Sequence, residues 1–174
     1  MRRALYPGTF DPIHLGHVDI ATRSAAIFDE LIVAIYDRPA KSLLFTTEER
    51  VALAREALKD LPNVRVMAYS GLTVDFARQV GAQTIVRGLR VISDFEWEYQ
   101  MALTNRQLAP EVEFVCLMTR QEYAFLSSSI LKEVALLGGD VSRMAPPNVI
   151  ALLEDKRQEM EQRRGPVPLV SLRD

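Results

Sequence analysis

Five short apolar runs, separated by stretches with helical patterns, constrain the fold of this chain more than any other feature. Each run has the length and the β-branched or aromatic content of a buried strand. Strands that alternate with helices favour a parallel sheet covered on both faces, because parallel strands need long crossover connections. We therefore predict an α/β fold with strands at RALYP (3–7), LIVAIY (31–36), VRVMAY (64–69), TIVRG (84–88) and VEFVCLM (112–118).

Residues that start and stop helices lie between these runs. Thr46 and Glu49 have the spacing of a capping box, in which each side chain bonds the other's backbone N–H. Gly81 follows TVDFARQV as a C-terminal stop, and the segment 127–139 runs from three serines to Gly-Gly. These signals predict helices after the second and third strands and after the fifth.

The C-terminal part of the chain has a different character. Residues 146–164 predict a charged surface helix, and the Gly and two Pro of GPVPLVSLRD (165–174) break any continuation of it. We predict one domain over 1–159 and a C-terminal extension over 160–174, formed by the end of this helix and an irregular tail.

Composition narrows the class of protein. The 174 residues carry a formal net charge of −2, which argues against a nucleic-acid partner. No run is long enough to span a membrane, and the first apolar residues are too few for a signal peptide. The single cysteine, Cys116, cannot form an internal disulfide, and its place in a strand predicts core packing rather than catalysis. We expect a soluble cytoplasmic protein.

Polar side chains that suit a phosphate ligand follow the predicted strands. Ligands of open α/β sheets bind at the carboxyl ends of the strands. After the first strand, Gly8 and Thr9 offer backbone N–H groups and a hydroxyl to phosphate oxygens. Ser127, Ser128 and Ser129 stand where a helix begins, although serines there cap helices about as often as they bind ligands.

Three cations follow other strands at the same predicted edge. They are Lys41, Arg87 and Arg90, and each taken singly is usually a solvated charge. Together with the loop residues they suit a polyphosphate. The phosphate-loop pattern G-x-x-x-x-G-K-[ST] and the dinucleotide fingerprint G-x-G-x-x-G are both absent from the sequence, so a nucleotide would be held in another way.

Both histidines of the chain, His14 and His17, lie in one short segment, HLGH. Two histidines three residues apart could bind a metal or cap a helix. The sequence places no cysteine or second acidic cluster near them, which makes a metal site the less favoured interpretation.

The motifs HLGH (14–17) and LSSSILK (126–132) resemble the paired [HT]-x-G-H and [IL]-S-S-[ST]-x-x-[KR] motifs of the nucleotidylyltransferase superfamily. Within it, YPGTFDP, FTTEERVAL, RGLRVISDFEWEYQMALTNRQL and LSSSILKEVA are similar to the bacterial phosphopantetheine adenylyltransferases across about residues 3–155. The resemblance implies a Rossmann-like doubly wound sheet. It also implies transfer of the adenylyl group of ATP to 4'-phosphopantetheine, with Mg²⁺ held mainly by ATP phosphates and without a covalent intermediate.

The resemblance also implies residue roles. Catalysis would depend on His17, Lys41 and Thr9. The implied ATP-binding residues are Thr9, Phe10, His17, Gly88, Leu89, Arg90, Glu98, Tyr123, Ala124, Phe125, Leu126, Ser127, Ser128 and Ser129. The implied residues on the pantetheine side are Thr9, Lys41, Thr73 and Arg87. Gly16 would let the start of its helix approach the nucleotide, and His14 would support His17.

The chain departs from the family pattern at two positions. The family often has threonine where this chain has His14, and tryptophan is common at the position of Tyr123. The nearest rival hypothesis is a sister enzyme that uses nicotinamide mononucleotide, glycerol phosphate or another phosphomonoester as acceptor, and the RGLR and DFEWEYQMALTNR segments argue against it. A second rival is a non-catalytic nucleotide sensor, which would keep the adenine contacts but could lose His17 or Lys41; both residues are present in this chain. A purely structural α/β module ranks last.

The resemblance further implies a homohexamer, built as a dimer of trimers, and feedback by coenzyme A. One segment bears on assembly from its own residues. The stretch 94–108 carries Phe95, Trp97, Tyr99, Met101 and Leu103, more apolar side chains than one core-facing stripe needs. A subunit contact and a purely core position are both open interpretations of this stretch.

Overall fold

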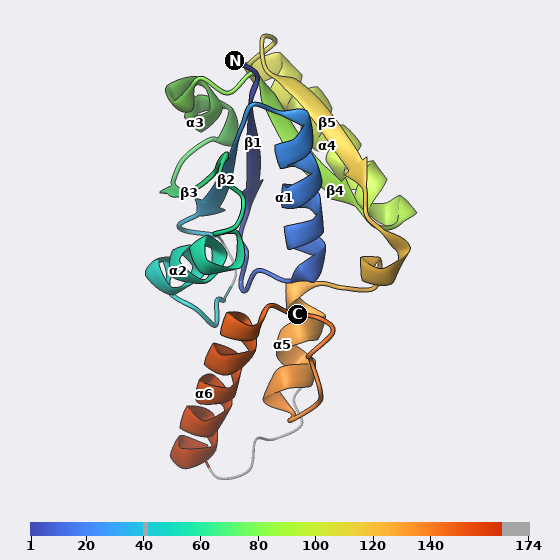
Figure 1. The fold of residues 1–174 in the computed structure, drawn as a ribbon. Coiled ribbons are helices and arrows are strands. Elements are labelled where there is room, and N and C mark those ends of the chain that lie inside the picture. The colour runs from blue at the N-terminus through green and yellow to red at the C-terminus, as the bar shows by residue number, and fades with distance from the viewer. Residues whose placement is uncertain (40–41, 165–174) are drawn as a thin grey trace.

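The chain forms one five-stranded, all-parallel sheet in a computed structural model, which describes residues 1–39 and 42–164. The strand order is β3-β2-β1-β4-β5 (Figure 1). The strands are β1 (Arg3–Gly8), β2 (Glu30–Tyr36), β3 (Val64–Tyr69), β4 (Thr84–Leu89) and β5 (Glu113–Met118). Each coincides with one predicted apolar run to within a residue at either end, which confirms the strand predictions.

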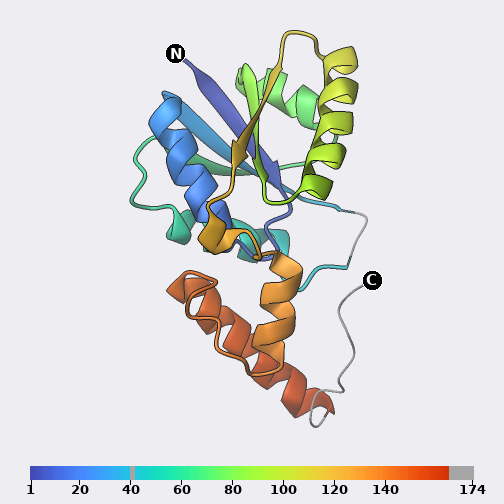
Figure 2. The same ribbon diagram turned by 90° about the vertical axis from the view of Figure 1, so that its right-hand side faces the viewer.

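Helices cover both faces of the sheet. They are α1 (Leu15–Ile27), α2 (Thr47–Ala57), α3 (Thr73–Val80), α4 (Ile92–Leu108), the short 3₁₀ helix η1 (Gln121–Tyr123), α5 (Ser128–Leu136) and α6 (Pro147–Arg164). Helices α1 and α2 lie on one face, and α3 and α4 lie on the other (Figure 2). The predicted doubly wound fold is therefore confirmed.

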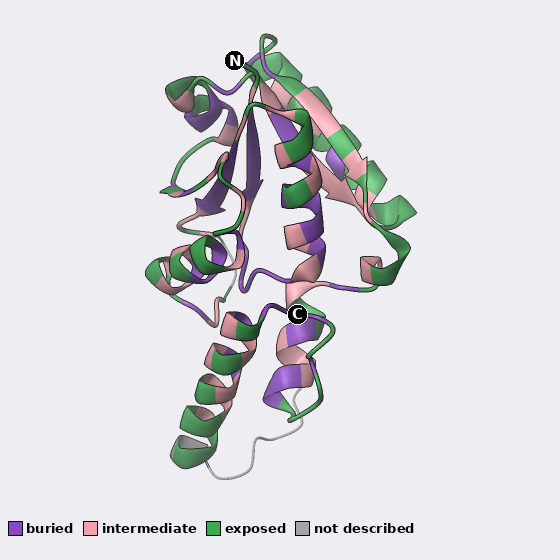
Figure 3. Ribbon diagram, in the orientation of Figure 1, coloured by how far each residue is buried: buried purple, intermediate pink, exposed green. Residues whose placement is uncertain are grey.

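Two apolar clusters separate along the pleat of the central strand. Successive side chains of a strand point to opposite faces. Tyr6 of β1 therefore packs with Ile20 of α1 in one cluster, whereas its neighbour Leu5 packs with Phe76 of α3 in the other. Figure 3 shows the buried residues concentrated in β1, β2 and the inner faces of the helices.

The last two helices lie beyond the carboxyl ends of the strands (Figure 1). Helix α6 is tied to α2 by a hydrogen bond from Asn148 to the Leu53 carbonyl (3.0 Å) and by an ion pair between Lys156 and Glu49 (3.0 Å). It continues without interruption through the predicted boundary at residues 159 and 160. Residues 165–174, the irregular tail of the prediction, lie outside the described part of the chain.

The predicted start and stop signals are confirmed. Thr46 and Glu49 form the reciprocal capping box of α2. Gly81 ends α3 with φ of 68°, a left-handed conformation that glycine adopts without a steric penalty. Ser127 caps α5 by accepting a hydrogen bond from the Ile130 N–H.

Arg50 of α2 joins the ends of two central strands from inside the protein. Its side chain is fully buried. One guanidinium nitrogen donates to the carbonyl oxygens of Thr9 and Tyr36, both at 2.8 Å, which follow or end β1 and β2. Further donors reach the Asp37 carbonyl and the Thr47 hydroxyl. The guanidinium therefore satisfies oxygens that the sheet leaves unpaired at its carboxyl edge.

The edge strand and its neighbouring helix contradict two interpretations. Cys116 is exposed, so its predicted core position is wrong: β5 is an edge strand, and its side chains are only half covered. On α4 the only buried residue is Glu98. Phe95 and Trp97 are 55% and 63% exposed, so the core-only interpretation of this helix is also wrong, as its exposed colouring in Figure 3 shows.

His14 and His17 cap α1 together. The Nδ1 atom of His14 accepts a hydrogen bond from the His17 N–H (3.3 Å), and Nδ1 of His17 accepts one from the His14 N–H (3.2 Å). The predicted cap is thus confirmed, with a histidine in place of the usual Glu or Gln of a capping box. Burial, with a smaller contribution from the Arg90 charge, lowers the pKa of His14 to about 3.

The buried neutral state of His14 makes stability depend on pH. An unfolded histidine binds its proton near pH 6.5, whereas folded His14 stays neutral to about pH 3. Between these values the unfolded chain binds the extra proton, so stability is complete above about pH 6.5 and falls as pH is lowered. We expect this one group to remove about 2 kcal/mol of unfolding free energy between pH 7.5 and 5.

Urea unfolding at both pH values measures this effect. The matched variant is His14→Thr, whose hydroxyl can still cap the helix but does not titrate. The variant should lose about 2 kcal/mol less than the wild type over the same pH interval. Equal losses in the two proteins would show that His14 is not held neutral.

Candidate functional site

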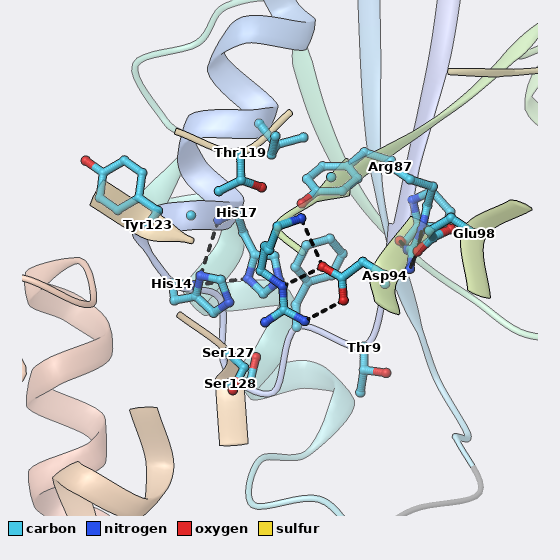
Figure 4. A pocket seen from close by; sticks show the side chains of 18 of the residues that line it. Thr9, His14, His17, Arg87, Asp94, Glu98, Thr119, Tyr123, Ser127 and Ser128 are labelled. Carbon is cyan, nitrogen blue, oxygen red and sulfur yellow. Dashed lines mark hydrogen bonds and ion pairs between the residues drawn. The ribbon is translucent and has the colours of Figure 1, made fainter. Parts of the chain in front are cut away.

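A cavity of about 370 Å³ opens at the carboxyl edge of the sheet. Its walls come from the loop after β1, the start of α1, the loop between β4 and α4, and the segment that leads from β5 to α5 (Figure 4). This is the edge at which the sequence predicts a ligand, and a Rossmann-like sheet places it there because all its strands end together.

Most of the predicted site residues line this one cavity. They are Thr9, Phe10, His17, Arg87, Gly88, Arg90, Glu98, Tyr123, Ser127, Ser128 and Ser129. Five others do not line it: Leu89, Thr73, Ala124, Phe125 and Leu126. Thr73 begins α3, where its hydroxyl is 3.0 Å from that of Tyr69. Lys41 lies outside the described residues.

Several lining residues were not predicted. They include Tyr6, Pro7, Ile20, Asp94, Trp97 and Thr119. Thr119 directly follows β5, so the rule that found the other loops could have found it. Asp94 stands four residues after Arg90 at the start of α4, a spacing typical of a helical ion pair. Nothing in the sequence around Trp97 marked it as a residue of the site.

The two histidine rings are stacked, with centroids 3.6 Å apart and planes 21° apart. A backbone N–H can only donate, so the bond from His14 makes Nδ1 of His17 an acceptor. Neutral His17 therefore carries its proton on Nε2, the nitrogen with which it can donate to an anion. Figure 4 shows this ring among the residues that line the cavity.

Two glycines make room for aromatic rings around His17. A Cβ atom on Gly8 would lie 2.9 Å from the ring of Phe10, which in turn meets His17 edge-on at a centroid distance of 4.8 Å. A Cβ on Gly16 would lie 3.1 Å from the His14 ring and 3.4 Å from Cβ of Tyr123. Gly16 thus admits the stacked histidine and Tyr123.

Arg87 projects from β4 and is held on two sides. Its Nε lies 2.9 and 3.0 Å from the two Glu98 carboxylate oxygens, and Nη2 donates to Oε1 at 2.7 Å. Nη1 donates to the Pro7 carbonyl. Burial opposes the charge of Arg87, but the bonds to Glu98 outweigh it and raise the pKa of the guanidinium above its usual value.

Arg90 spans the mouth of the cavity in a similar way. Nε and Nη2 donate to the two carboxylate oxygens of Asp94 at 3.0 and 3.1 Å, and the Arg90 backbone N–H also donates to Asp94 (3.0 Å). Nη1 donates to the Leu126 carbonyl at 2.6 Å. Arg90 therefore links the start of α4 to the segment before α5.

The serines at the start of α5 are joined to the first loop. Ser128 donates to the Pro12 carbonyl at 2.9 Å. Lys132, one turn further along α5, forms a 2.6 Å ion pair with Asp11, which is almost fully buried. The chain before α2 binds the same carboxylate, because the N–H groups of Leu44 and Phe45 both donate to Asp11.

The described residues lack two features, a cluster of metal ligands and a membrane-spanning helix. Residues 1–39 and 42–164 contain no cluster of three or more His, Cys, Asp or Glu side chains that could hold a metal ion. No helix in this part of the chain is long and apolar enough to cross a membrane. The cavity itself offers an imidazole donor, two arginines, hydroxyls and a helix N-terminus, which together suit a polyphosphate.

Known proteins share both the fold and the sequence. The cytidylyltransferase-like family model matches residues 5–134. A lipopolysaccharide core biosynthesis protein from Thermoplasma volcanium has a similar structure, with a TM-score of 0.53 and 26% identity, covering 70% of this chain and 99% of that one.

Closer relatives align with most of the chain. The phosphopantetheine adenylyltransferase of Thermomicrobium roseum is 57% identical over 157 residues, which cover 88% of this chain and 94% of that protein. The phosphopantetheine adenylyltransferase of Heliobacterium modesticaldum is 54% identical and covers 96% of this chain and 99% of its own length. With these identities and the motifs gathered in one cavity, the chain belongs to the phosphopantetheine adenylyltransferase family within the cytidylyltransferase-like proteins.

Proposed function

We propose that this protein transfers the adenylyl group of ATP to 4'-phosphopantetheine, giving dephospho-coenzyme A and pyrophosphate. The observation that carries the proposal is the single cavity in which the HLGH loop, the RGLR loop and the LSSS segment meet. These segments are remote in the chain, and the ion pairs and hydrogen bonds described above bring them together.

The reaction needs placement and charge stabilisation more than proton transfer. A phosphomonoester has a second pKa of about 6, so the acceptor already carries a nucleophilic oxygen near pH 7. No catalytic base is required. The protein must align two anions for in-line attack and stabilise charge on the α-phosphate and on the departing pyrophosphate.

The site residues divide this work in our proposal. The Nε2–H of His17 donates to the ATP phosphates, most strongly in the transition state. Thr9 contacts both substrates, and Arg87, Lys41 and Thr73 serve the phosphopantetheine side. The ATP-binding residues are those of the family motifs, with Arg90 and the serines at the start of α5 facing the polyphosphate.

Magnesium enters this proposal on ATP. The two carboxylates that line the described cavity, Asp94 and Glu98, are each engaged by an arginine. This arrangement fits an ion held mainly by phosphate oxygens and water, as Mg²⁺ prefers, rather than a dedicated protein cage. When bound, the ion would offset polyphosphate charge.

The first experiment measures pyrophosphate release from ATP and Mg²⁺ with 4'-phosphopantetheine, beside nicotinamide mononucleotide and glycerol 3-phosphate. We expect release only with 4'-phosphopantetheine, with dephospho-coenzyme A as the product. Release with another acceptor would indicate a sister enzyme, and ATP binding without release would indicate a nucleotide sensor. We also propose feedback by coenzyme A, so added coenzyme A should slow the reaction. The cytoplasmic location stays a prediction.

His17 can be tested apart from its role as a helix cap. His17→Ala should lower kcat by about 100-fold, the cost of removing a donor that acts in the transition state, and change KM for ATP less than threefold. His17→Gln should keep the thermal midpoint of the wild type, because glutamine can occupy its position in a capping box, and should retain more activity than His17→Ala, because its amide N–H can still donate to a phosphate. A raised KM with unchanged kcat would contradict the assignment.

We further propose that the exposed apolar side of α4 forms a subunit contact of a homohexamer. Phe95 and Tyr99 stack on its surface with centroids 5.8 Å apart, and Leu103 continues the exposed apolar side chains along the helix. An apolar surface of this kind marks an interaction site in many soluble proteins.

Assembly can be followed by sedimentation velocity. Phe95→Glu should convert a species of six 19.6-kDa chains into smaller ones, because a charge buried in an apolar contact is costly. The control is Leu137→Glu, a residue exposed to a similar extent beyond the end of α5. A wild-type monomer, or a hexamer that survives Phe95→Glu, would contradict this contact.

A further inference from the structure

Four ionised side chains line the described part of the cavity, and they form two pairs. Arg87 is paired with Glu98, and Arg90 with Asp94. Among the described lining residues the formal charges therefore cancel. The cavity is proposed to bind a highly charged polyphosphate, yet each of its arginines is already paired with a carboxylate of the protein. The two carboxylates, Asp94 and Glu98, lie one helical turn apart on α4.

The two pairs differ in how firmly they are closed. The side chains of Arg87 and Glu98 are 30% and 8% exposed, and Arg87 also donates to the Pro7 carbonyl at the end of β1. The side chains of Asp94 and Arg90 are 19% and 35% exposed. The two arginines are thus exposed to a similar extent, and the pairs differ in the carboxylate: Asp94 is more accessible to water or a ligand than Glu98.

Asp94 is charged when it holds Arg90. Burial alone would raise the pKa of this carboxyl, but the hydrogen bonds from Arg90 outweigh burial and lower it below its ordinary value. Asp94 occupies two guanidinium nitrogens, Nε and Nη2. These form the fork with which an arginine binds a phosphate through two parallel bonds.

The remaining bond of Arg90 does not depend on Asp94. Nη1 donates to the Leu126 carbonyl, which holds the guanidinium independently of the carboxylate. If the Asp94 charge were removed, Arg90 would keep this hydrogen bond, and Nε and Nη2 of this cavity-lining residue would be available to an anion. Loss of the carboxylate should therefore strengthen anion binding rather than displace the arginine.

We propose that Asp94 is a positioning residue that competes with bound polyphosphate for Arg90 and thereby limits how tightly pyrophosphate is retained. The inference deepens the proposed function, because pyrophosphate is the product that the site must release. A site that attracts two anionic substrates gains in turnover from an internal carboxylate that helps to displace the product.

The test is the affinity of the full-length protein for inorganic pyrophosphate, measured by isothermal titration calorimetry without ATP or acceptor. Asp94→Asn should bind pyrophosphate about fivefold more tightly than the wild type, the scale of one partly exposed ion pair. Asp94→Glu keeps the charge and should stay within twofold of the wild type. A merely structural role would weaken binding in both variants.

The matched control is Asp75→Asn on α3. Asp75 likewise pairs with an arginine, Arg78, at 3.2 Å, but it does not line the cavity, so its change should leave the affinity unaltered. If Asp94→Asn does not fold, Asp94→Ser serves in its place. Unchanged or weaker pyrophosphate binding in the folded variant, or no measurable binding by the wild type, would overturn the inference.

The pyrophosphate-binding test and the test of the proposed function can succeed or fail independently. Pyrophosphate binding requires no acceptor, so tighter binding by Asp94→Asn supports the role of Asp94 even if 4'-phosphopantetheine is not the substrate. Conversely, a wild type that makes dephospho-coenzyme A while Asp94→Asn binds pyrophosphate no more tightly would uphold the function and reject the inference.

Discussion

The buried carboxylate of Asp11 is the contact on which the cavity depends. It accepts bonds from Lys132 of α5 and from the N–H groups of Leu44 and Phe45. Three segments that are remote in the chain therefore meet at one charge, beside the loop that carries Thr9. Removing one partner of such a buried pair leaves the other charge uncompensated, which is far more costly than the pair's net contribution.

The same edge of the sheet is also held by Arg50, whose guanidinium donates to the carbonyls after β1 and at the end of β2. In both cases a charged side chain, Asp11 or Arg50, binds backbone N–H or carbonyl groups that have no partner in the sheet. As a result the N–H groups of Leu44 and Phe45 and the carbonyls of Thr9 and Tyr36 are already bound before a ligand arrives. Catalysis by electrostatic stabilisation benefits from such preorganisation, because little rearrangement remains to be made during the reaction.

The sheet was predictable because its strands are nearly continuous apolar runs with turn residues after each, and the carboxyl-edge rule then located the ligand loops. The ion pairs in the cavity were not predictable from the sequence, because Arg87 of β4 and Glu98 of α4 come together only through the packing of α4 on β4. Cys116 and Phe95 were misjudged or left open for a related reason: an apolar sequence does not say whether a strand is at the edge or what covers a helix. Lys41 stays a prediction.

The departure at His14 has a physical explanation that leaves His17 unaffected. What α1 requires of residue 14 is a side-chain acceptor for the His17 N–H, which histidine and the threonine common in the family can both supply. The tautomer of His17 is set by the backbone N–H of residue 14, which every residue except proline provides. A histidine at this position therefore changes how stability depends on pH, while the proton on Nε2 of His17, which the proposed chemistry uses, is retained.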